Sequence, residues 1–113
     1  MDANTGRRSH PHAVLFDLDG TLLDTTEAII SSLQYTMKRF TGREMTLDEM
    51  RPVMGLPLAD IFQSLTPGRV QEACDTYVTH NVAVHKDLVK PYPGVVETIK
   101  TLTDYGIKRA IVT

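Results

Sequence analysis

The sequence has few of the features that would tie a protein to a membrane, to nucleic acid or to an oxidising compartment. It contains no tryptophan and a single cysteine, Cys74, so that no intrachain disulfide can form, which is typical of a reducing compartment. No apolar run approaches the roughly 18 residues of a membrane span, and none of signal-peptide length follows Arg7 and Arg8. The formal net charge of −2 gives no attraction to polyanions. We therefore expect a cytoplasmic protein with neither a membrane nor a nucleic acid as its partner.

The 113 residues are 42% hydrophobic and 23% charged, which is typical of a globular domain. Residues 1–11 are polar and without periodicity, and we expect a flexible tail there. Residues 13–16 form a continuous apolar run, and residues 110–113 end the sequence with a similar one. Apolar runs without polar alternation predict strands that are buried on both faces, as in a parallel sheet.

Between these two runs the apolar residues recur at helical spacing. Signals for the start of a helix occur three times, at Asp24 with Glu27, at Thr46 with Glu49, and at Thr66 with Pro67. A Pro/Gly break at residues 91–94 precedes one more amphipathic segment, which ends at Gly106.

This order predicts an α/β fold, a partial Rossmann-like core with two parallel strands that is interrupted by a helical module. The expected boundaries are a tail at 1–11, half of a core at 12–23 and 91–113, and the helical module at 24–90.

Two carboxylates follow the first predicted strand. Asp17 and Asp19 are two residues apart and therefore face the same way while the backbone stays extended. Like charges held this close need a cation or a proton, and Mg²⁺ prefers carboxylate and carbonyl oxygens. Gly20 permits a sharp turn, and ligands bind at the carboxyl ends of parallel strands. The alternative is an ordinary polar turn, in which these residue types are common.

The order of residues 16–25, Phe-Asp-Leu-Asp-Gly-Thr-Leu-Leu-Asp-Thr, resembles motif I of the haloacid dehalogenase superfamily. Its extension at 22–25 resembles the subfamily that contains phosphoglycolate phosphatase and β-phosphoglucomutase. The segment at 91–95 and the apolar run after it resemble that subfamily's return to its core, with Thr113 on motif II. The resemblance implies that the helical module at 24–90 is a cap domain.

Catalytic roles follow from this resemblance at the matching positions. Asp17 would attack phosphorus and form an aspartyl phosphate, and Asp19 would act as the general acid and base. Mg²⁺ would bind the carboxylate of Asp17 and the backbone carbonyl of Asp19. Thr113, Leu18 and Asp19 would bind the phosphate. The implied partner is a small phosphorylated metabolite such as phosphoglycolate.

A turn in the helical module resembles the cap loop of phosphoglycolate-phosphatase-like members, and it supplies candidate specificity residues, namely Arg51, Gly55, Leu56 and Pro57. The alternative is a connector between helices with a solvent-facing arginine. His80 and His85 are five residues apart, off the spacing that aligns ligands on a helix, and we expect surface histidines. Cys74 and the methionines are expected in the core.

The resemblance also implies a motif III lysine and a motif IV acidic cluster after the second strand, where this sequence ends. The expected chain is thus about half of a family member, with an incomplete site. A phosphomutase like β-phosphoglucomutase is one alternative to a phosphatase. The other is a non-catalytic fragment or assembly partner that associates through its open sheet edge.

Overall fold

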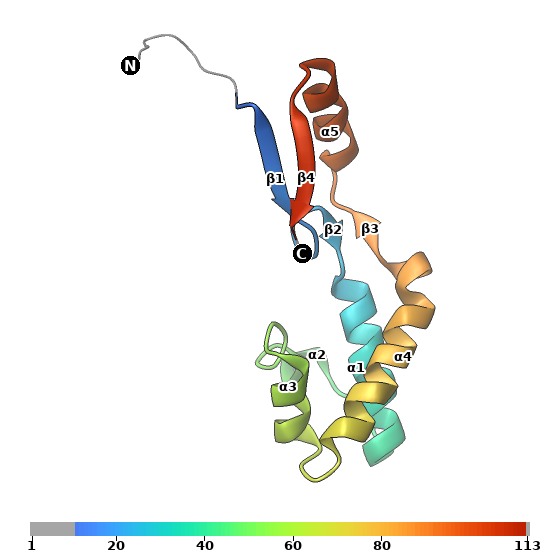
Figure 1. The fold of residues 1–113 in the computed structure, drawn as a ribbon. Coiled ribbons are helices and arrows are strands. Elements are labelled where there is room, and N and C mark those ends of the chain that lie inside the picture. Colours follow the sequence, from blue (N-terminus) through green and yellow to red (C-terminus); the bar gives the residue numbers. More distant parts are fainter. Residues whose placement is uncertain (1–10, 113) are drawn as a thin grey trace. The chain divides into compact units, whose positions relative to one another are not determined.

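The structure is a computed structural model that describes residues 11–112 (Figure 1). The chain divides into two compact units, with the divisions after Asp24 and after Lys90. The helical unit is Thr25–Lys90, and the strand unit contains the described residues on either side of it. None of the described helices has the length and apolar character that a membrane span requires. Of the predicted features, residues 1–10 of the tail and Thr113 lie outside the described residues.

The strand unit contains two long strands that pair in parallel. These are β1 (Ala13–Asp17) and β4 (Lys108–Val112), which lie side by side in Figure 1. Their register places Ala13 opposite Lys108. Helix α5 (Val95–Asp104) precedes β4 and packs against it. The short strands β2 (Leu23–Asp24) and β3 (Lys90–Pro91) form a second two-stranded sheet. Parallel strands in a chain of mixed helices and strands confirm the predicted α/β class.

The two long strands are much more exposed than their apolar sequences predicted. The side chain of Leu15 is 67% exposed, and those of Ile111 and Val112 are each 55% exposed. A parallel strand is buried on both faces only when other elements cover both sides of its sheet, and among the described residues this unit has one helix, α5. The predicted strands are therefore confirmed, whereas their predicted burial is wrong.

The helical unit contains four helices, namely α1 (Thr26–Thr41), α2 (Leu47–Met50), α3 (Leu58–Leu65) and α4 (Val70–Leu88). Both α1 and α3 pack against α4. The core lies between these helices and consists of Leu33, Met37, Met45, Met50, Val53, Ile61, Phe62 and Ala73. Cys74 is partly buried against this core, and burial raises the pKa of its thiol, with a smaller effect from the nearby Asp75. The expected packing of Cys74 and of these three methionines is confirmed.

Capping boxes were predicted at two of the three helix starts, and the one at Thr46 with Glu49 is confirmed. The backbone N–H of Glu49 donates to the Thr46 hydroxyl at 3.2 Å, and the Thr46 N–H donates to the Glu49 carboxylate at 2.9 Å. The capping box predicted at Asp24 with Glu27 is wrong. Asp24 lies in β2, and Thr25 occupies the N-cap position of α1 without a side-chain cap hydrogen bond. Strand pairing of residue 24 explains the difference, because it takes that residue out of the cap position.

The helix start predicted at Thr66 and Pro67 is also wrong. The Thr66 hydroxyl donates to the Phe62 carbonyl at 3.0 Å, so this residue closes α3 instead of opening α4. Gly68 then adopts a left-handed conformation with φ of 85°, which glycine does without steric cost. Helix α4 consequently begins at Val70.

Candidate active site

The loop after β1 is folded around a single backbone carbonyl. The carbonyl oxygen of Leu18 accepts hydrogen bonds from the backbone N–H groups of Thr21, Leu22 and Leu23, at 3.4, 2.9 and 3.0 Å. Leu22 is buried and anchors the loop in the strand unit, and its own carbonyl accepts from Tyr92 N–H at 3.0 Å. These bonds satisfy the backbone of a tight turn and fix the path of the chain beyond the strand.

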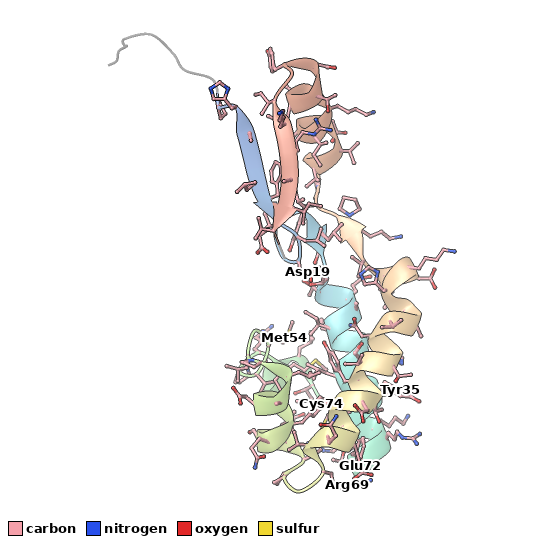
Figure 2. All side chains as sticks on the ribbon, viewed as in Figure 1. Asp19, Tyr35, Met54, Arg69, Glu72 and Cys74 are labelled. Carbon is pink, nitrogen blue, oxygen red and sulfur yellow. The ribbon has the colours of Figure 1, made fainter. Side chains whose placement is uncertain are left out.

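Both candidate catalytic carboxylates lie on this folded turn. Asp17 is the last residue of β1, and Asp19 follows in the loop (Figure 2). Both side chains are exposed, and the backbone N–H of Leu18 donates to Asp17 Oδ1 at 3.0 Å. Gly20 permits the reversal, because its φ of 79° is unfavourable for other residues. The arrangement presents two carboxylates to solvent from a fixed backbone at the end of a strand.

The sheet register decides what lies beside Asp17. Asp17 is opposite Val112 in the ladder between β1 and β4. The carboxyl ends of the two strands therefore meet at the same edge, where α/β proteins place their ligands. Thr113, the predicted phosphate-binding residue, comes next in the sequence and lies outside the described residues, so its placement stays a prediction. The phosphate-binding roles of Leu18 and Asp19 also stay predictions.

The oxygen donors of this loop are suited to Mg²⁺ in kind and in number. The described residues contain no cluster of three or more His, Cys, Asp or Glu side chains that could hold a metal ion. Mg²⁺ does not require such a cage, since it usually keeps several waters and binds one or two carboxylates together with substrate phosphates. The carboxylate of Asp17 and the backbone carbonyl of Asp19 fit this pattern.

The four candidate specificity residues lie in the helical unit, around the connection between α2 and α3. Arg51 is exposed and forms an ion pair with Asp48 at 2.5 Å. Gly55 has a left-handed φ of 94°, Leu56 is 48% exposed, and Pro57 directly precedes α3. The carboxylate of Asp48 partly offsets the positive charge of Arg51.

A contact between two helices was not foreseen from the sequence. His80 of α4 stacks on Tyr35 of α1 with ring centroids 4.3 Å apart, and its Nε2 is 2.9 Å from the Ser31 hydroxyl. This contact leaves His80 partly exposed, whereas His85 is exposed as expected. The contact joins distant parts of the sequence, which spacing within one helix cannot reveal.

Comparison with known proteins adds an independent line of evidence. Residues 14–113 match the haloacid dehalogenase-like hydrolase family. The pyrophosphatase PpaX of Halalkalibacterium halodurans is 48% identical over 102 residues, which cover 90% of this chain and 47% of that protein. The pyrophosphatase PpaX of Anoxybacillus flavithermus is 40% identical with the same coverage. The chain thus spans about half the length of these curated relatives.

Solved structures resemble the chain to a similar extent. A protein described as a predicted phosphatase from Clostridium acetobutylicum is 30% identical, with a TM-score of 0.72 over 93% of this chain and 50% of the other. A haloacid dehalogenase-like family hydrolase from Streptococcus pneumoniae is 26% identical, with a TM-score of 0.76 over 89% and 48%. The family match includes both Asp17 and Asp19. This chain belongs to the haloacid dehalogenase-like hydrolase family.

Proposed function

We propose that the protein takes part in Mg²⁺-dependent hydrolysis of inorganic pyrophosphate through an aspartyl phosphate on Asp17. The observation that carries this proposal is the Asp17–Asp19 turn at the carboxyl end of a parallel strand. The choice of substrate is supported by the 48% identity to a protein named as a pyrophosphatase.

Asp17 is assigned as the nucleophile. The Leu18 N–H engages Oδ1, and we assign the attack on phosphorus to the other carboxylate oxygen. A bond forms between this oxygen and the phosphorus, while the bond from phosphorus to the bridging oxygen breaks and orthophosphate leaves. A carboxylate can serve as a covalent catalyst in this way. Water then attacks the aspartyl phosphate, releases a second orthophosphate and restores the carboxylate.

Asp19 is assigned as the general acid and base. It would donate a proton to the leaving oxygen in the first step and accept one from the attacking water in the second, as one group can do in a two-step displacement. Its position on the turn, two residues after the nucleophile, places it on the same short segment as Asp17.

Mg²⁺ would be held by the Asp17 carboxylate and the Asp19 carbonyl, and it would supply neutralisation of the negative charge on the phosphate. The backbone N–H groups of Leu18 and Asp19 and the hydroxyl of Thr113 would donate to phosphate oxygens. For Leu18 this requires sharing the N–H that now engages Asp17.

The helical unit is assigned as a cap that selects the substrate, with Arg51, Gly55, Leu56 and Pro57 as its specificity loop. A small, highly charged anion such as pyrophosphate would compete with Asp48 for the Arg51 guanidinium. Phosphoglycolate, which the sequence motifs favour, and a sugar phosphate, the substrate of a mutase, are the competing substrates.

A chimera tests this assignment. The 113-residue chain would be joined to the portion of the Halalkalibacterium halodurans pyrophosphatase that it does not match. Orthophosphate release is then measured with pyrophosphate, phosphoglycolate and β-glucose 1-phosphate in the presence of Mg²⁺. We expect the highest kcat/KM for pyrophosphate. Preferential hydrolysis of phosphoglycolate would overturn the substrate, and isomerisation of the sugar phosphate would indicate a mutase.

A further inference from the structure

A hollow of about 450 Å³ lies between α1 and α4, entirely within the helical unit. The residues that line it include Tyr35 and Arg39 from α1, with Asp75, Thr79 and His80 from α4. A second hollow of about 270 Å³ shares Tyr35 and Arg39 with the first and adds Lys38. Ligand sites of small molecules typically measure roughly 300–1,000 Å³, so the larger hollow is of a suitable size.

The hollow contains an aromatic ring that is held in place. Tyr35 stacks on His80 with an angle of 15° between the ring planes, and His80 is in turn hydrogen-bonded to Ser31. Tyr35, labelled in Figure 2, is nevertheless 45% exposed. A ring that is fixed on one side and accessible elsewhere is a stacking platform for a planar heterocycle.

The same hollow contains the positive charge of Arg39, which has no acidic partner among the described residues. Three of the four arginines of the helical unit are paired with acids, in the pairs Arg43–Glu49, Arg51–Asp48 and Arg69–Glu72. Within residues 11–112, the Arg39 guanidinium makes no such pair. Lys38 is near Glu44, but their charged atoms are 3.7 Å apart and both side chains are well exposed. An exposed guanidinium without an acidic partner is suited to bidentate binding of a phosphate.

Helix α4 supplies hydrogen-bonding groups opposite these cations. The Asp75 carboxylate accepts from the Gln71 amide through Oδ1 at 2.9 Å, and a carboxylate has capacity to accept further hydrogen bonds. Thr79 contributes a hydroxyl to the lining. Groups of this kind complement a polyhydroxylated ligand.

We propose that this hollow binds a nucleoside monophosphate. The base stacks on Tyr35, the ribose hydroxyls donate to Asp75, and the phosphate pairs with Arg39. The site consists of residues of the helical unit alone and does not depend on the catalytic assignment of Asp17 and Asp19.

Isothermal titration of the 113-residue chain with AMP tests the proposal, with adenosine and inorganic phosphate as partial ligands. We expect AMP to bind more tightly than either. Arg39→Gln and Tyr35→Leu should each weaken AMP binding by about tenfold or more, given typical strengths of charge-assisted hydrogen bonds and base stacking. Tyr35→Phe retains the ring and should bind nearly as wild type, and Lys100→Gln is the matched loss of a positive charge in the other unit. Far-UV circular dichroism confirms that each variant is folded.

Amide chemical shifts in an ¹⁵N-labelled sample locate the ligand independently of the variants. AMP should shift the amides of residues 35–39 and 75–83. Equal affinity for AMP and inorganic phosphate would overturn the nucleotide assignment. Absence of AMP binding, or binding that is lost in Asp17→Asn but kept in Arg39→Gln, would overturn the site.

Discussion

Asp17 of β1 lies directly opposite Val112 of β4 in the parallel ladder, although the two residues are almost the whole chain apart. This pairing brings the carboxyl ends of both strands to one edge of the sheet. The turn after Asp17 is closed locally by the carbonyl of Leu18, so the position of Asp17 depends on one long-range and one local set of hydrogen bonds.

Asp17→Asn is expected to reduce pyrophosphate hydrolysis by the chimera by several orders of magnitude. The substitution keeps the shape of the side chain but removes the negative charge that, in the proposed mechanism, attacks phosphorus. Steady-state orthophosphate release with Mg²⁺ measures the effect. Asp104→Asn removes an exposed carboxylate elsewhere in the same unit and should leave turnover unchanged. Wild-type turnover by Asp17→Asn would show that another residue is the nucleophile.

The 113-residue chain alone should hydrolyse pyrophosphate much more slowly than the chimera. The chain spans 47% of the pyrophosphatase that it matches, and the family resemblance implies a lysine and an acidic cluster in the part that only the chimera contains. Preorganised charges of this kind contribute factors of about 10² to 10³ each. Both proteins are assayed at equal concentration over a range of Mg²⁺, and EDTA should abolish the activity of the chimera. Equal activity of the two proteins, abolished in both by Asp17→Asn, would mean that the chain already contains a complete site.

Glu49→Gln should destabilise the protein near neutral pH and have little effect in acid. Hydrogen bonds from Arg43 and then from the backbone of Thr46 lower the pKa of Glu49 from 4.5 to about 2. A lowered pKa stabilises the folded state above the ordinary pKa, and this contribution is lost as the pH falls through the folded-state value. In thermal unfolding, the wild type should therefore have a higher Tm than Glu49→Gln at pH 7. This difference in Tm should shrink between pH 4.5 and pH 2. Asp87→Asn is the control. A difference in Tm between the wild type and Glu49→Gln that does not change with pH would contradict the prediction.

Leu33→Ala should cost about 2–5 kcal/mol of unfolding free energy, because it removes buried methyl groups and leaves a cavity. Leu33 is fully buried between the helices of the helical unit. Val82→Ala removes apolar volume from a side chain that is 69% exposed and should have little effect. Urea unfolding followed by far-UV circular dichroism compares the two. Similar free energies of unfolding for Leu33→Ala and Val82→Ala would show that the core is not packed as described.

The sequence was most informative where structure is local. The capping box at Thr46 depends on residues three apart, and the strand that begins at Ala13 depends on one short apolar run. The order of residues around Asp17 likewise identified the turn and its family. Each of these features is encoded within a few residues, so no long-range contact had to be known.

One error was local: Thr66 and Pro67 have the pattern of a helix start, but the Thr66 hydroxyl bonds back to Phe62, four residues earlier. The other errors arose where distant residues decide the outcome. The stack of Tyr35 on His80 depends on how two helices pack. The exposure of Leu15 depends on which elements cover the sheet. A short apolar run does not encode that information.

The exposed sheet leads to the last prediction, that the 113-residue chain self-associates through its strands. Leu15, Ile111 and Val112 are each more than half exposed, and in the described residues β1 and β4 pair only with each other. Each strand therefore presents one open edge, which is a template for pairing with another chain.

Light scattering at several concentrations should show a mass that rises with concentration. The double variant Leu15→Lys, Ile111→Lys places charges on the exposed apolar side chains and should lower the association, whereas Val82→Lys, on the exposed surface of α4, should not. Strand amides should exchange faster with deuterium in the double variant, because the edge is then open to water. A wild-type chain that remains monomeric at all concentrations, with strand amides as protected as those of its helices, would contradict the prediction.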